Sequence, residues 1–338
     1  MLREACLRNM LTQDTEWNIS FAGCGFLGIY YFGVYSCLLE RAQHLIKSTR
    51  RICGASSGAL IAAMIVCQMS PAKCCENLMA IAKEARKGML SSMHPSFNLL
   101  KLTRQLMIRD LPDNAHLLAS GKLFVSLTRL SDGKNVLVSE FTSRDDLIQA
   151  LFCSCFFPVY CGVVPPCYHG THYVDGALSD STPYSSLKNT ITVSPFSGES
   201  DICPDDNPVY CQEVMAEICN NGYKDALVYL KENDLLEHDS FITEFIANHK
   251  LNRSTRGKSS VLDKNLLPVP VQKVFSDAST KKHGRKRELF ALKLLTSILM
   301  VCILPLEVVG FILLRLASWM VEMASDLLRR YRWMKLSS

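Results

Sequence analysis

The chain has 338 residues, a length that accommodates one large α/β domain and a smaller appendage around a sizeable core. With 48% hydrophobic and 20% charged residues and a mean hydropathy of +0.11, it has the composition of a folded protein, yet it is more apolar than a wholly soluble chain usually is. The net charge of +5 is small and basic residues are not densely interleaved with aromatic ones, which argues against nucleic acid as a partner.

The cysteines and the N-terminus indicate a reducing environment. The 15 cysteines follow no regular pairing, and neighbours such as Cys74 and Cys75 are too close for an ordinary bridge or a zinc knuckle. We therefore expect free thiols. Residues 1–16, an N-terminal extension, carry charges and lack the continuous apolar core of a secretory signal peptide. The sequence thus predicts a cytoplasmic protein that is not secreted, and nothing in it implies a metal or another cofactor.

The first part of the chain predicts two units of strand, glycine turn and helix. Residues 17–21 predict a strand and 23–28 a glycine-rich turn, after which an apolar helix runs through Leu39. A second strand at 51–53 and a tight turn precede a buried helix at 59–67. Pro71 then opens an amphipathic helix.

The second part predicts a hairpin, a helix and further strands. Residues 122–129 and 135–141 are rich in strand formers, and the Asp132-Gly133 pair between them is a strong hairpin signal. A helix from about 143 to 152 is followed by strands ending near 175 and at 190–193. This alternation predicts an α/β fold with a mainly parallel central sheet and one hairpin.

The first candidate site is the G-x-S-x-G sequence between the second strand and the buried helix, where Ser56 is flanked by Gly54, Ala55, Ser57 and Gly58. At such an elbow, glycines remove the Cβ atoms that would block a sharp reversal, and the serine is lifted to the positive end of a helix. Ser56 is therefore the candidate nucleophile. The alternative is a small-residue turn that merely caps the helix.

The second candidate is the glycine-rich turn, and two functions compete for it. Its spacing matches the dinucleotide fingerprint, but the second strand ends in Ile52-Cys53-Gly54 rather than in the acidic residue that would hold a ribose. Backbone N–H groups without an acceptor at the start of a helix can also stabilise the oxyanion that forms during acyl transfer. We assign this oxyanion loop to Gly23, Cys24, Gly25, Phe26, Leu27 and Gly28.

The third candidate is a base for the serine. Asp175 stands at a strand end, and Gly176 and Ala177 after it form a loop that allows close approach of another element. A partly desolvated carboxylate beside Ser56 would accept its proton without an imidazole. A triad through His169 or His172, six and three residues earlier, is the alternative, and an ordinary Asp-Gly turn is a further one.

Together these residues resemble the patatin-like phospholipase family, in particular its vertebrate branch with adipose triglyceride lipase and adiponutrin. The matching stretches lie at residues 17–28, 54–60, 94–99, 126–135, 173–176 and 188–204. The resemblance implies a three-layer α/β/α sandwich over residues 17–187, extended by 188–249, and a Ser56–Asp175 dyad without histidine. It also implies lipid esters as substrates, above all triacylglycerol, and acyl transfer in some members.

Three departures from the family pattern affect the site. Ala177 stands where a second glycine is usual, Leu27 replaces the basic residue of plant and bacterial members, and the segment after Pro204 is short. The last of these changes bears on the walls of the substrate pocket.

The C-terminal part changes in composition. Residues 250–288 predict a basic polar linker, and residues 289–338 predict apolar helices that associate with a membrane or a lipid droplet. The run 294–314 is long enough to span a bilayer, but Pro305 and Glu307 lie within it. A buried helical hairpin is the alternative to a lipid-bound segment.

The sequence therefore predicts a lipid-ester hydrolase at the surface of lipid droplets or membranes, including the endoplasmic reticulum. The expected partners are lipid esters, a lipid surface and an α/β-hydrolase-like coactivator protein. A catalytically weak lipid-droplet protein that sequesters this coactivator is the alternative function, and a dinucleotide-binding enzyme is a third.

Overall fold

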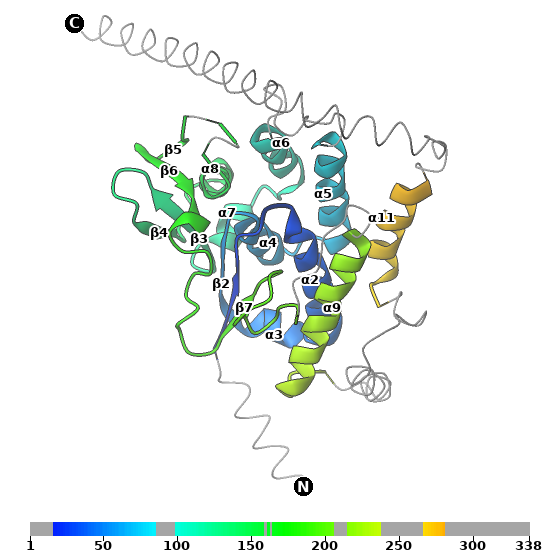
Figure 1. Cartoon of the computed structure of the whole chain (residues 1–338). Helices are drawn as coiled ribbons and strands as arrows, with labels where there is room; N and C mark the ends of the chain where they lie inside the picture. The colour runs from blue at the N-terminus through cyan, green and yellow to red at the C-terminus, as the bar shows by residue number, and fades with distance from the viewer. Residues whose placement is uncertain are drawn as a thin grey trace, which may run out of the picture.

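The computed structural model describes residues 16–85, 99–158, 161–162, 164–205, 215–237 and 266–280. In this part of the chain, helices pack against a central seven-stranded sheet (Figure 1). The strands, in sheet order, are β5 (Cys167–Tyr168), β6 (Thr171–Asp175), β3 (Leu123–Arg129), β2 (Thr49–Ala55), β1 (Trp17–Phe21) and β7 (Thr190–Val193), with β4 (Asn135–Val138) paired to β3.

The helices expected from the apolar periodicity are present. The longer ones are α2 (Ile29–Arg41), α4 (Ser57–Val66), α5 (Pro71–Ala85), α6 (Leu99–Asp110), α8 (Arg144–Ser154), α9 (Met215–Glu232) and α11 (Val269–Thr280). Short elements are α3 (Gln43–Ser48), α7 (Ala115–Ala119) and two 3-10 turns, η1 (Gly25–Gly28) and η2 (Gly176–Leu178).

The sheet is mixed rather than mainly parallel, which corrects the expectation. β3, β2, β1 and β7 run parallel, whereas β4 and β6 pair with β3 in the antiparallel sense and β5 pairs likewise with β6. The hairpin of β3 and β4 was expected from the Asp-Gly turn. The pairing of β6 with β3 joins residues far apart in the sequence, and no local pattern marks its direction.

One face of the sheet carries the main apolar core. Ile191, Ile19, Ile52 and Leu123 lie in register across four strands, and all belong to one buried cluster that includes the helices. On the other face, the loop after η2 contacts β3. In this contact, the ring of Tyr184 packs edge-on against the ring of Phe124. Among the described residues, the main core and the loop that carries Tyr184 thus lie on opposite faces of the sheet.

The ends of β2 and β6 meet on one edge of β3. Ser126 pairs with β2 and with β4, and Leu127 pairs with β4 and with β6. Because a strand has only two edges, β2 and β6 share the edge opposite β4. Ala55, the last residue of β2, lies opposite Ser126, and Asp175, the last residue of β6, lies opposite the next residue, Leu127. This register brings the turn after β2 to the end of β6.

The C-terminal expectations lie largely outside the described residues. Within the region assigned to a polar linker, however, α11 forms and packs against α5, with Leu267 and Val271 buried and Phe275 partly buried. Leu267, Val271 and Phe275 recur every fourth residue, a spacing that indicates a helix, but the basic composition of the region favoured a linker. Among the described residues, no helix is both long and apolar enough to cross a membrane. Residues 289–338 and the proposed domain boundaries stay predictions.

Candidate active site

Ser56 occupies a strained turn between β2 and α4. Its backbone has φ 54° and ψ −125°, a conformation that costs a non-glycine residue about 1–3 kcal/mol. Ser154, at the end of α8, holds the turn in place: its Oγ accepts a hydrogen bond from the Ser56 amide at 2.9 Å and donates one to the carbonyl of Ser126 at 2.8 Å. Ser154 is fully buried, so its bond to the Ser126 carbonyl is shielded from water.

The two elbow glycines are required by close backbone contacts. A Cβ at Gly54 would lie 2.3 Å from the carbonyl of Gly58, and a Cβ at Gly58 would lie 2.2 Å from the carbonyl oxygen of Phe21. Real Cβ atoms essentially never come so near to backbone atoms. The turn therefore packs directly against its own helix and against the end of β1, as the G-x-S-x-G spacing predicts.

Asp175 is 4% exposed and is fixed by backbone contacts at the end of β6. Its Oδ1 accepts a hydrogen bond from the Ala177 amide at 2.9 Å, and its carbonyl accepts one from Thr128 Oγ1 at 2.7 Å. Gly176 leaves no room for a side chain, since a Cβ there would lie 2.0 Å from the carbonyl oxygen of Ser126. The loop that begins with Asp175 and Gly176 therefore packs directly against the backbone of β3.

Ser56 lies near the carboxylate of Asp175, close enough to affect its pKa. Burial raises the pKa of Asp175, and hydrogen bonds from the Ser56 hydroxyl and the Ala177 amide oppose this rise. A carboxylate with a raised pKa is a better proton acceptor than an exposed one.

Cys155 is a further neighbour of this pair, and sequence reasoning missed it. Burial raises the pKa of its thiol well above the usual range, the nearby charge of Asp175 raises it further, and a hydrogen bond with Ser56 lowers it. Cys155 is thus a neutral thiol beside the serine. In the sequence, the only signal is the run Cys153-Ser154-Cys155 at the end of α8, since small residues before a loop suit a packed site.

The glycine loop lies against both other loops. A Cβ at Gly23 would lie 2.7 Å from the Cβ of Ala177 and 3.5 Å from the Cβ of Ser56, so the three sequence-predicted segments converge at this point. Gly25 has φ +58°, which favours glycine, whereas a Cβ at Gly28 would make only ordinary contacts. Phe26 and Leu27 complete the η1 turn and are half-buried.

The amides of this loop divide into two groups. The Gly23 amide donates to the carbonyl and hydroxyl oxygens of Ser181, and the Cys24 amide donates to Ser57 Oγ at 3.1 Å. These two amides are engaged within the protein. Gly25 and Phe26 begin the η1 turn, where N–H groups have no acceptor inside the helix. Their amides are the donors that this loop offers to a ligand.

The histidines of the alternative triad hydrogen-bond elsewhere. His169 Nε2 lies 2.9 Å from Asp146 Oδ1, and its ring stacks on Tyr168. His172 is exposed and its Nδ1 bonds to the carbonyl of Pro165 at 2.9 Å. Neither contacts Ser56 or Asp175, so these interactions give the triad no support. Among the described residues, no group of three or more His, Cys, Asp or Glu side chains is placed to hold a metal ion.

An apolar pocket begins beside the elbow. It has a volume of about 700 Å³, part of it open to solvent, and its lining includes Gly25, Gly28 and Ser57. From there it extends between α4, α5 and α6, where leucine, isoleucine and methionine side chains predominate. The pocket thus reaches Ser57, the residue that follows Ser56 in the elbow.

Comparisons with known proteins agree with this arrangement. A family model described as "Patatin-like phospholipase" matches residues 19–188. The chain is 38% identical to the patatin-like phospholipase domain-containing protein 2 of Rattus norvegicus, over 96% of this chain and 76% of that protein. It is 36% identical to the 1-acylglycerol-3-phosphate O-acyltransferase Pnpla3 of Mus musculus, over 94% of this chain and 87% of that protein. The chain belongs to the patatin-like phospholipase family, as its glycine loop, serine elbow and Asp-Gly element suggest.

Proposed function

We propose that the protein hydrolyses lipid esters, with triacylglycerol as its main substrate, and that Ser56 is the nucleophile and Asp175 the general base. Membership of a family of lipid-ester hydrolases supports the reaction class. The observation that carries the residue roles is the meeting of the Ser56 hydroxyl and the buried Asp175 carboxylate, beside free loop amides and the mouth of an apolar pocket.

The reaction follows from these positions. Asp175 accepts the proton of Ser56 as its Oγ attacks the acyl carbonyl, and the amides of Gly25 and Phe26 stabilise the resulting oxyanion. The alcohol then leaves with the proton from Asp175, and an acyl-enzyme remains. Water attacks the acyl carbon while Asp175 takes its proton, and Ser56 recovers a proton as the fatty acid departs. A second alcohol in place of water would give acyl transfer.

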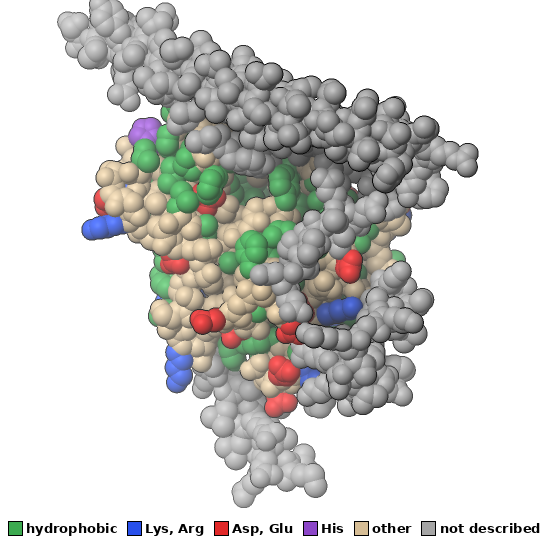
Figure 2. Space-filling model, viewed as in Figure 1, with side chains coloured by type: hydrophobic (Ala, Val, Ile, Leu, Met, Phe, Trp, Pro, Cys, Tyr) green, Lys and Arg blue, Asp and Glu red, His purple; other side chains and the backbone are tan. Residues whose placement is uncertain are grey.

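The exposed surface near Asp175 suits a lipid substrate. Phe157 and Leu178 are both exposed, and each lies next to a backbone segment that contacts Asp175 or follows it directly. Hydrophobic side chains gather around α8 in the upper part of the face shown in Figure 2. We extend the proposal to a lipid-droplet or membrane surface as the site of action. Deletion of residues 289–338 should release the protein from droplets without abolishing hydrolysis of a short soluble ester, and retention on droplets would contradict this extension.

The test is product analysis with emulsified triacylglycerol and with phospholipid, for the wild type, Ser56→Ala and Asp175→Asn. We expect fatty acid release from triacylglycerol by the wild type alone. Addition of 1-acylglycerol-3-phosphate as an acceptor distinguishes transfer from hydrolysis, since a relative is named for that transfer. A wild type that releases no product from any lipid would contradict the proposal and favour the coactivator-binding alternative.

A further inference from the structure

The walls of the apolar pocket differ in how they are held. α4 forms the inner wall, and the pocket follows it from Ser57 to Met64, about 10 Å at 1.5 Å per residue. α5 and α6 form the outer walls, and besides Thr103 they contribute two polar residues to a mainly apolar lining, Asn77 and Asp110. Such residues in a lipid pocket require an explanation.

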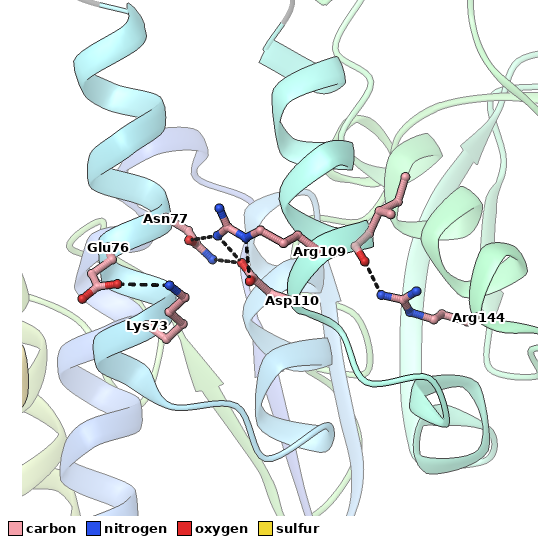
Figure 3. A network of polar contacts seen from close by, with 7 residues as sticks. Lys73, Glu76, Asn77, Arg109, Asp110 and Arg144 are labelled. Carbon is pink, nitrogen blue, oxygen red and sulfur yellow. Dashed lines mark hydrogen bonds and ion pairs between the residues drawn. The ribbon is translucent and has the colours of Figure 1, made fainter.

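Asn77 and Asp110 bind each other across the gap between α5 and α6 (Figure 3). Asn77 Nδ2 donates to Asp110 Oδ2 at 2.6 Å, and Arg109 Nη2 donates to Asn77 Oδ1 at 2.7 Å and to Asp110 Oδ2 at 2.6 Å. We call these three residues the helix bridge. The exposed fractions of its side chains rise from 12% at Asp110 to 55% at Arg109, so the bridge extends from the pocket lining to the molecular surface.

The bridge presents no free charge to the pocket. The Arg109 hydrogen bond lowers the pKa of Asp110 and keeps this carboxylate ionised, and both of its oxygens accept hydrogen bonds within the bridge. Because the polar atoms satisfy one another, an acyl chain would meet mainly their carbon atoms. The bridge therefore closes the wall without favouring a polar ligand.

The C-terminal end of α6 is also anchored from α8. Arg144 donates to the carbonyls of Ile108 and Leu111, which lie at the end of this helix, and Figure 3 draws one of these two contacts. Together with the bridge, this contact fixes the lower part of α6 against both neighbours. An acyl chain that reaches the gap between α5 and α6 thus meets a barrier that is held from two sides.

We infer that the pocket holds the acyl chain of the substrate ester and that the helix bridge, by closing the gap between α5 and α6, limits the length of chain that the pocket accepts. This inference rests on the proposed function. Since the inner wall is about 10 Å long, the wild type hydrolyses soluble esters of medium chain length best and long-chain esters less well.

The experiment measures kcat and KM for p-nitrophenyl esters from butanoate to stearate with full-length variants. Asn77→Ala and Asp110→Ala should open the gap. The kcat/KM for stearate, divided by the kcat/KM for butanoate, should then rise about tenfold or more, because a few methylene groups bound in a pocket have an effect of this size. The change lies mainly in KM. Butanoate hydrolysis stays near the wild-type rate, because its acyl group is too short to reach the bridge.

The matched control is Gln105→Ala, which removes an exposed polar side chain of α6 outside the pocket lining. It should keep the wild-type chain-length profile. Leu106→Trp tests the opposite direction by filling the pocket from α6, and it should shift the profile toward shorter esters even if the bridge variants fail to fold.

The outcomes separate this inference from the proposed function. If the wild type hydrolyses esters but the profile is the same in the bridge variants, or does not shorten in folded Leu106→Trp, the bridge does not set chain length and the inference is wrong while the hydrolase proposal stands. If the wild type hydrolyses none of the esters and no lipid, both proposals fail.

Discussion

The reaction centre and the outer wall of the pocket are stabilised by different kinds of contact. Around Ser56 and Asp175, backbone packs on backbone, and Gly58 and Gly176 have no room even for a Cβ. Between α5 and α6, the connection is a side-chain bridge that a single substitution can remove. In the proposed function, the chemistry therefore depends on backbone packing at the strand ends, whereas the inferred selectivity depends on exchangeable side chains. The predictions below test this difference.

The largest expected effect is that of Asp175→Asn on catalysis. Loss of the base should lower hydrolysis of every ester about a thousandfold or more. Thermal stability should stay the same or rise, because burial raises the pKa of Asp175 and so penalises its ionised form in the folded state. Ester assays and thermal unfolding followed by circular dichroism measure the two effects. An active variant, or one with a much lower Tm, would contradict the assignment.

Gly58→Ala should damage the fold itself. Its Cβ would lie 2.2 Å from the Phe21 carbonyl oxygen, so β1 and α4 must separate, at a cost of about 3 kcal/mol or more. Gly28→Ala is the matched control, because its nearest contact, with the Ser57 Cβ, would be an ordinary 3.5 Å. Equal free energies of unfolding for the two variants, measured by urea denaturation, would show that the backbone contact at the elbow is not tight.

Ser154→Ala should have an intermediate effect. It leaves the Ser56 amide and the Ser126 carbonyl without their buried partner, which costs about 1–3 kcal/mol of stability. Because the Ser56 turn loosens, kcat should fall about tenfold with little change in KM. Ser276→Ala, an exposed serine on α11, controls for the chemical change. If kcat is unchanged in Ser154→Ala, Ser154 does not position the nucleophile.

The smallest effect is expected in the pH dependence of selectivity. The base must be ionised, and burial raises the pKa of Asp175 above its usual 3.8, so activity on all esters falls as the pH drops through this raised value. The pKa of Asp110 is lowered from its usual value. The helix bridge is therefore fully formed above the usual pKa of an aspartate, and it is lost only when the pH falls through the lowered pKa. The ratio of long-chain to short-chain hydrolysis should therefore stay constant along the acid limb. A ratio that changes with activity would show that acid affects both regions together.

Sequence alone predicted the tight backbone contacts of the elbow and the Asp-Gly loop, but it did not predict the pocket. Gly54, Gly58 and Gly176 mark local backbone constraints, and such constraints can be recognised from residue type and spacing. Other features depend on contacts between segments that are distant in the sequence. Examples are the antiparallel pairing of β6 with β3 and the hydrogen bond between Ser154 and the Ser56 amide. Asn77 and Asp110 look like ordinary polar residues on amphipathic helices, so no pattern indicated that they meet across a pocket.

The most direct test of the account is covalent labelling with a fluorophosphonate, followed by peptide mapping. This reagent forms a stable adduct with an activated serine. We expect one adduct on Ser56, no adduct in Ser56→Ala and much slower labelling in Asp175→Asn. A wild-type adduct that maps to another residue, or labelling that Ser56→Ala leaves unchanged, would contradict the assignment of Ser56 and Asp175 as the reacting pair.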